Sequence, residues 1–201
     1  GKEEATELSA AEKLEGYRKQ MPHYLGQSFA PIIAYGSHGA IVHYEPTQET
    51  DIPLGNESFL LADTGGHYLE GTTDITRTIA MGSVTKLQKQ HYTAVLMGNL
   101  RLMDAKFRYG LSGAHLDYLA REPLYRMGLD FKHGTGHGVG YLLNVHEGPN
   151  AIRSRVAEDG VFKQGMITSD EPGLYIEGAY GIRLENLILC VHAEKTEYGQ
   201  F

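Results

Sequence analysis

Residues 133–140 read HGTGHGVG, and this stretch constrains the fold more than any other part of the sequence. Its two histidines, His133 and His137, stand four residues apart, but the glycines around them make a stable helix unfavourable. Glycine lets a backbone approach a ligand or another strand closely, and histidine supplies an imidazole for a metal ion or a proton. His146 follows shortly afterwards. Each histidine alone is more simply a structural residue bonded to a backbone carbonyl, whereas three together indicate a site.

Four acidic residues lie in or beside apolar stretches of the chain. Asp63 ends one apolar run, and Asp74 lies inside the β-branched run that we expect to pair with it. Glu171 directly follows a third run, and Glu185 lies inside a fourth. Carboxylates in such places cost several kcal/mol to bury unless a cation or a proton joins them.

Two explanations for these carboxylates stay open at this point. They are ordinary paired acids, with Arg183 as the ion-pair partner of Glu185 because the two share one face of a strand. Alternatively, the four carboxylates share one site with His137 and two divalent cations neutralise them. Oxygen-rich ligation with one imidazole suits Mn²⁺, Co²⁺, Fe²⁺ or Zn²⁺ and favours manganese, and a two-metal site activates water.

The remaining sequence patterns predict an α+β domain with a mostly antiparallel sheet, since strands and helices do not alternate regularly. Short apolar runs predict strands at 32–35, 40–44, 59–63, 72–80, 166–170 and 181–191, with a surface loop at 46–56. Helical periodicity predicts helices at 9–21, capped by Ser9, at 85–107, and from 112 to 128 with an interruption at Pro123. The expected apolar stripe of the long helix is Leu87, Tyr92, Val95, Leu96, Leu100 and Met103.

Composition narrows the class of protein. The 201 residues, 41% of them hydrophobic, suffice for one core, and a net charge of −7 without a basic run argues against nucleic-acid binding. No apolar run is long enough to suggest a membrane span, and the N-terminus does not read as a signal peptide. Cys190 stands alone, which excludes an internal disulfide and fits a reducing compartment, so we expect a cytoplasmic protein.

Five segments together resemble the pita-bread metallopeptidases, the family of aminopeptidase P, prolidase and methionine aminopeptidase. The set as a whole is most similar to aminopeptidase P. Within the family, His133 and the segment GIRLEN (181–186) are similar to the aminopeptidase P and prolidase branch. The segments are GAIVHY (39–44), ADTGGHYLEGTTDITRT (62–78), HGTGHGVGYLLNVHEGP (133–149), SDEPGLY (169–175) and GIRLEN (181–186). The resemblance implies the pita-bread fold, a mostly antiparallel curved sheet covered by helices.

The resemblance also implies roles for individual residues. Asp63 would bind one of two divalent metal ions, most simply Mn²⁺ with Zn²⁺ or Co²⁺ as alternatives, and Asp74 and Glu185 would bridge both. His137 and Glu171 would complete the other ion's ligands, and Glu171 would transfer the proton after a metal-bridging hydroxide attacks. Further residues would line the substrate site or hold the ligands: His43, His133 and His146 to orient the scissile carbonyl and stabilise the oxyanion, Arg183 and Tyr175 behind the carboxylates, and Tyr44 and Val139 around the proline.

The implied enzyme is a metal-dependent aminopeptidase that hydrolyses the Xaa-Pro bond at the N-terminus of a peptide. Family members carry further domains before this one and a segment after it, so we expect residues 1–201 to be the catalytic domain of a longer protein that forms a homodimer. Two alternatives are a prolidase restricted to Xaa-Pro dipeptides and a non-catalytic peptide-binding module of the same fold. A module of that kind is expected to lack several of the five ligands, all of which this sequence keeps.

Overall fold

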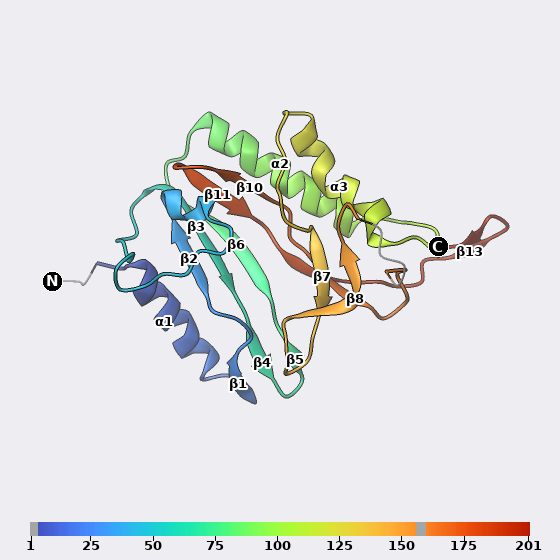
Figure 1. Ribbon diagram of the computed structural model, residues 1–201, viewed down its shortest axis with the longest axis horizontal. Helices are drawn as coiled ribbons and strands as arrows, with labels where there is room; N and C mark the ends of the chain where they lie inside the picture. Colours follow the sequence, from blue (N-terminus) through green and yellow to red (C-terminus); the bar gives the residue numbers. More distant parts are fainter. Residues whose placement is uncertain (1–3, 156–159) are drawn as a thin grey trace.

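In the computed structural model, which describes residues 4–155 and 160–201, every strand pair in those ranges is antiparallel. Helices cover the sheets from two sides (Figure 1). The expected α+β class and antiparallel pairing are therefore confirmed. None of the helices in the described ranges has the length and apolar character needed to cross a membrane.

The first sheet comes from the first half of the chain. Three strands form it, in the order β2-β3-β6. The central strand β3 pairs with β6 along its whole length, so that Asp63 stands opposite Thr76. A smaller sheet, in the order β1-β4-β5, continues from its lower end in Figure 1. The strands are β2 (Ile32–Tyr35), β3 (Glu57–Thr64) and β6 (Ile75–Gly82), then β1 (Tyr24–Gln27), β4 (Gly66–Tyr68) and β5 (Gly71–Thr72).

The second half of the chain forms a four-stranded sheet in the order β12-β9-β7-β8, with two further hairpins beside it. The strands are β7 (Gly136–Val139), β8 (His146–Ile152), β9 (Ile167–Asp170) and β12 (Asn186–Leu189), with the hairpins β10 (Gly173–Ile176) to β11 (Tyr180–Arg183) and β13 (Lys195–Thr196) to β14 (Gly199–Gln200).

Hydrogen bonds from β6 connect the two halves. Thr78 Oγ1 donates to the Arg183 carbonyl at 2.9 Å and accepts from the Arg183 N–H at 3.0 Å. The Glu185 N–H donates to the Thr76 carbonyl at 3.2 Å. Residues 76–78 of the first half and residues 183–185 of the second half therefore lie side by side.

Two helices, α2 (Lys86–Met103) and α3 (Gly113–Tyr125), lie side by side over the sheets in Figure 1, and α1 (Glu7–Arg18) lies near β2. The main core lies between α2, α3 and the β10–β11 hairpin and buries Phe59, Val95, Leu124, Leu174 and Ile182, among others. Burial of this apolar surface is what holds the helix layer on the sheets.

Several expected boundaries are wrong. Thr6 caps α1 in place of Ser9, because Thr6 Oγ1 accepts from the Ser9 N–H while Ser9 Oγ accepts from the Thr6 N–H. Residues 40–44 do not form a strand, since the 3₁₀ helix η1 (Gly36–Ala40) and a turn replace it. Pro123 lies inside α3, where a proline removes one backbone N–H without ending this helix.

The expected apolar stripe of α2 is wrong in part, and the helix ends at Met103 instead of 107. Val95 is buried, but Leu87 and Leu100 are 54% and 50% exposed. The buried face includes His91, whose Nδ1 lies 2.9 Å from a tyrosine hydroxyl, and Asn99, which donates to a backbone carbonyl at 2.9 Å. Buried polar side chains normally have such hydrogen-bond partners, and hydrophobic periodicity does not reveal them.

The carboxylate of Glu7 joins α1 to the segment that follows β2. Glu7 is fully buried and accepts hydrogen bonds from the Tyr35 N–H and the Tyr44 hydroxyl, both at 2.6 Å. His38 Nδ1 lies 3.0 Å from the same carboxylate. One side chain therefore fixes three groups around η1.

We expect Glu7→Ala to lower the free energy of unfolding by about 3 kcal/mol, because it leaves buried partners without their acceptor. Urea denaturation followed by circular dichroism measures the change. Glu12 is exposed on the same helix, so Glu12→Ala is the matched control and is expected to change stability by less than about 0.5 kcal/mol. Equal losses in the two variants would contradict this account of Glu7.

Candidate metal centre

The structure brings together all five residues predicted as metal ligands. Asp63 lies in β3, Asp74 just before β6, His137 in β7, Glu171 just after β9, and Glu185 between β11 and β12. Oxygen and nitrogen atoms of these five residues and of His146 form three groups whose members lie within 4.8 Å of one another. The groups are Asp63, Asp74 and Glu185; His137, Glu171 and Glu185; and Asp74, His137 and His146.

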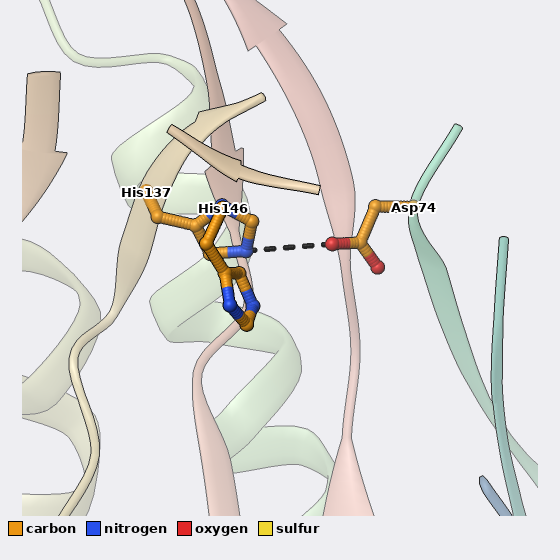
Figure 2. Close-up of side chains that lie close together, drawn as sticks. All are labelled: Asp74, His137 and His146. Carbon is orange, nitrogen blue, oxygen red and sulfur yellow. Dashed lines mark ion pairs between the residues drawn. The ribbon is translucent and has the colours of Figure 1, made fainter. Parts of the chain in front are cut away.

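Asp74, His137 and Glu185 each belong to two of these groups. Sequence reasoning did not count His146 among the ligands, yet its ring lies 4.2 Å from that of His137, centroid to centroid. Figure 2 shows both imidazoles on one side of the site, with Asp74 facing them from the other.

The imidazole of His137 is oriented for ligation by a backbone contact. Its Nδ1 lies 2.9 Å from the Gly138 carbonyl, so Nδ1 carries the hydrogen and Nε2 points into the cluster. Nε2 lies 3.4 Å from Asp74 Oδ2 and 3.1 Å from Glu171 Oε1. A metal-ligating histidine in proteins is fixed in the same way, through its other nitrogen.

Hydrogen bonding supports the fit of these residues to cations. Among the described residues, five buried side-chain atoms have no hydrogen-bond partner. Three of the five belong to the cluster: Asp63 Oδ1, His137 Nε2 and Glu185 Oε1. Buried polar atoms normally form hydrogen bonds, so three buried atoms in one cluster that form none fit ligands of metal ions.

Burial and mutual repulsion shift the protonation of the cluster. Burial raises the pKa of Asp63 to about 6, although Arg183 opposes the shift. Burial, Glu171 and Asp74 together raise the pKa of Glu185 to about 9. Burial lowers the pKa of His137, but the carboxylates of Asp74 and Glu171 outweigh it and raise that pKa to about 10. Without cations, the folded chain therefore holds protons in this cluster.

This protonation predicts that the chelator-treated chain is less stable at pH 9 than at pH 6. The folded pKa of Glu185, about 9, exceeds its ordinary value of 4.5, so its stabilising contribution is lost as pH rises through that window. His137 acts in the same direction between 6.5 and about 10. Urea denaturation at both pH values measures the difference, which is expected to be smaller in Glu185→Gln. Equal stability at pH 6 and pH 9 would contradict the prediction.

Arg183 pairs with Asp63 and not with Glu185, so the simple ion-pair explanation is wrong. Arg183 Nη2 donates to Asp63 Oδ2 at 2.7 Å, whereas Glu185 Oε2 accepts from the Thr76 hydroxyl at 2.8 Å. The expectation assumed one continuous strand, but β11 ends at Arg183 and β12 begins at Asn186. At this break between the strands, the side chain of Glu185 is directed toward the cluster.

A chain of hydrogen bonds fixes the state of His133. Arg183 Nη1 donates to the Tyr175 hydroxyl at 2.8 Å. The hydroxyl oxygen accepts this bond, so its own hydrogen is donated to His133 Nε2 at 2.7 Å. The other nitrogen, Nδ1, donates to the Gly134 carbonyl at 2.7 Å. Burial lowers the pKa of His133, in agreement with a neutral ring. Both nitrogens are thus engaged, and the expected contact of His133 with a substrate carbonyl requires one of these bonds to open.

The cluster opens into a cavity of about 550 Å³. The predicted substrate-site residues His43, His133 and His146 line it, as does Tyr44. Val139, although within the described residues, does not line it. Sequence reasoning missed an apolar wall, because its residues lie in short segments without periodicity; the wall consists of Phe29, Ala30, Ile32 and Val42.

Two glycines show why the HGTGHGVG stretch is so rich in that residue. A Cβ on Gly136 would lie 1.8 Å from the Ser169 carbonyl oxygen, and one on Gly138 would lie 2.1 Å from that of Glu147. Only glycine lets β7 pass this close to its neighbours. The expected close approach is confirmed, but between strands of the same chain.

Comparisons with known proteins agree with this arrangement. A model described as metallopeptidase family M24 matches residues 2–192. A Lotus japonicus protein named Aminopeptidase P1 is 46% identical over 195 residues, which are 96% of this chain and 30% of that protein. This chain thus spans less than a third of the length of that relative.

Two solved structures have the same fold. The X-prolyl aminopeptidase of Caenorhabditis elegans, described as a cytosolic enzyme with a di-nuclear active site, is 41% identical with a TM-score of 0.90, over 96% of this chain and 31% of its own. The prolidase of Pyrococcus furiosus is 33% identical with a TM-score of 0.84, over 94% of this chain and 53% of its own.

Proposed function

Because the chain belongs to metallopeptidase family M24, we propose that it is the catalytic domain of a metal-dependent aminopeptidase. The proposed enzyme releases the first residue of a peptide by hydrolysing its bond to a proline at the second position. The observation that carries the proposal is the cluster of Asp63, Asp74, His137, Glu171 and Glu185, in which three buried atoms form no hydrogen bond. The names of the plant and nematode relatives support the substrate class.

We propose two divalent cations in the cluster, with Mn²⁺ favoured over Zn²⁺ or Co²⁺. Four carboxylates and one imidazole form an oxygen-rich ligand set, and hard oxygen ligands favour manganese. When bound, such ions lower the pKa of water and polarise a carbonyl group. The di-nuclear site described for the nematode enzyme supports the number of ions.

Glu171 is the proposed acid and base of the reaction. Water adds to the scissile carbonyl carbon, the bond from that carbon to the proline nitrogen breaks, and the nitrogen takes up a proton. Glu171 lines the cavity, so its carboxylate is placed to accept the proton of water and deliver it to the nitrogen. His146 and His43 line the same cavity as candidate donors to the developing oxyanion.

The apolar wall of the cavity, which includes Phe29 and Val42, is the proposed contact for the proline ring. A pyrrolidine ring offers only apolar surface there, so selectivity for proline depends on the shape of the wall. Arg153 also lines the cavity and offers a positive charge to an acidic group of the substrate.

Hydrolysis of Arg-Pro-Pro by the chelator-treated chain, with and without added Mn²⁺, tests the proposal. Release of free arginine only in the presence of metal supports it. Cleavage of Arg-Pro but not of Arg-Pro-Pro would point to a prolidase instead. Peptide binding without release of arginine would point to a non-catalytic module, and the complete ligand set argues against that outcome.

The remaining expectations stay proposals. The cytosolic nematode relative supports a cytoplasmic location. A longer protein that carries residues 1–201 as its catalytic domain agrees with the 30% of the plant relative that this chain spans. A homodimer of that longer protein stays a prediction.

A further inference from the structure

Arg121, on the inner face of α3, is buried with only 6% of its surface exposed. Its Nη1 donates to the Phe131 carbonyl at 2.6 Å, and its Nη2 donates to the His133 carbonyl at 2.8 Å. Nη1 also donates to Asp130 Oδ1 at 2.8 Å, and the guanidinium lies 3.9 Å from the centre of the Phe131 ring. The cation therefore holds the segment that leads into β7 at several points.

Asp117, one turn earlier on α3, extends these contacts toward the cluster. Its Oδ2 accepts from Arg121 Nε at 2.7 Å, and its Oδ1 accepts from the hydroxyl of Thr135 at 2.6 Å. Thr135 is fully buried, and its carbonyl accepts from the N–H of Glu171 at 2.8 Å. A continuous set of hydrogen bonds thus runs from α3 to the backbone of a predicted metal ligand.

Phe131 packs in the main core and Tyr175 contacts His133 Nε2, but no regular structure constrains the backbone of this segment. Residues 131–135 lie outside regular structure, and the glycines at 134 and 136 leave their backbone many conformations. A buried ion pair such as that of Arg121 and Asp117 contributes little net stability compared with apolar residues of similar size. The contacts of Arg121 and Asp117 with residues 131–135 are therefore better explained by a role in holding the backbone in place than by a gain in the free energy of unfolding.

We propose that Arg121 is a positioning residue of the metal centre, which fixes the backbone of 131–135 and so places His137 and Glu171 for ligation. The proposal rests on the function proposed above. It predicts that small changes in α3, remote from the cavity, weaken metal binding while the fold persists. Substitution of groups that orient ligands costs about 10- to 100-fold in metal affinity or activity.

Isothermal titration of the chelator-treated chain with Mn²⁺ tests this inference, alongside kcat and KM for Arg-Pro-Pro. Arg121→Lys keeps the charge but loses the fork that holds two carbonyls. Thr135→Val removes one hydroxyl at nearly constant volume, and Thr135→Ser restores it. Arg126→Lys is the matched control, because Arg126, the C-cap residue of the same helix, is exposed and forms an ion pair with the residue four positions earlier.

We expect Arg121→Lys and Thr135→Val to raise the Mn²⁺ Kd about 10-fold or more and to lower kcat more than they change KM. Thr135→Ser and Arg126→Lys should match the parent chain. If folded Arg121→Lys or Thr135→Val binds Mn²⁺ as tightly as the parent chain, this inference is overturned while the proposed function is not. If Arg121→Lys fails to fold, the Thr135 pair decides. Absence of Mn²⁺ binding in the parent chain would overturn the proposed function, and this inference with it.

Discussion

The Asp74→Ala chain is expected to lose the proposed metal ions and the proposed peptidase activity together. Asp74 contributes an oxygen to two of the three ligand groups, so its removal weakens both proposed ion positions at once. Activity on Arg-Pro-Pro should fall by more than about 100-fold, the upper end of what substitution of an outer partner costs. Elemental analysis of protein purified without chelator should give about two ions per parent chain and far fewer in the variant.

Asp104→Ala is the matched control, because Asp104 is exposed at the end of α2 and belongs to none of the ligand groups. It should keep the metal content of the parent chain. Circular dichroism of both variants shows whether the fold persists. Full metal content in Asp74→Ala would mean that the cluster does not hold the ions.

Glu171→Gln is expected to lower kcat by roughly 10²- to 10⁴-fold, the range in which a positioned acid and base contributes to catalysis. The amide keeps the shape of the carboxylate but no longer accepts a proton. Single-turnover and steady-state kinetics at saturating Mn²⁺ measure the loss, and titration with Mn²⁺ shows how much of it comes from weaker ligation.

The hydrogen bond between Ser169 and Glu171 offers a comparison within the site. Ser169 Oγ donates to Glu171 Oε1 at 3.0 Å, so Ser169→Ala leaves the carboxylate in place with one bond fewer. A much smaller effect is expected of that variant. A Glu171→Gln chain that keeps at least a tenth of the parent kcat would exclude Glu171 as the group that transfers the proton.

The types of residue at the candidate metal centre were predictable, because carboxylates inside apolar strands are costly to bury without a partner and three histidines lie close together near glycines. The resemblance to pita-bread metallopeptidases assigned the five ligands, and the match to the family confirms that resemblance. His146 beside His137 was expected to contact substrate, and it also lies within ligand distance.

The partners of buried polar residues were not predictable from sequence. Strand parity suggested that Arg183 pairs with Glu185, but the break between β11 and β12 turns these side chains to different partners. No sequence pattern distinguished Glu7 or Arg121, yet tertiary contacts bury both. Asp170 is fully buried with two unpaired oxygens, and burial raises its pKa to about 8, which no sequence pattern predicts.

The joining of β6 to the β11–β12 region has a consequence for the lifetime of the protein. Asp63 and Asp74 come from the first half of the chain, and Glu171 and Glu185 from its last fifth, so shared ions would act as a removable cross-link across more than half of the sequence. At a hundred times its Kd, one bound ion adds about 2.7 kcal/mol to stability. Depletion of the metal would then expose the chain to proteases as well as stop hydrolysis.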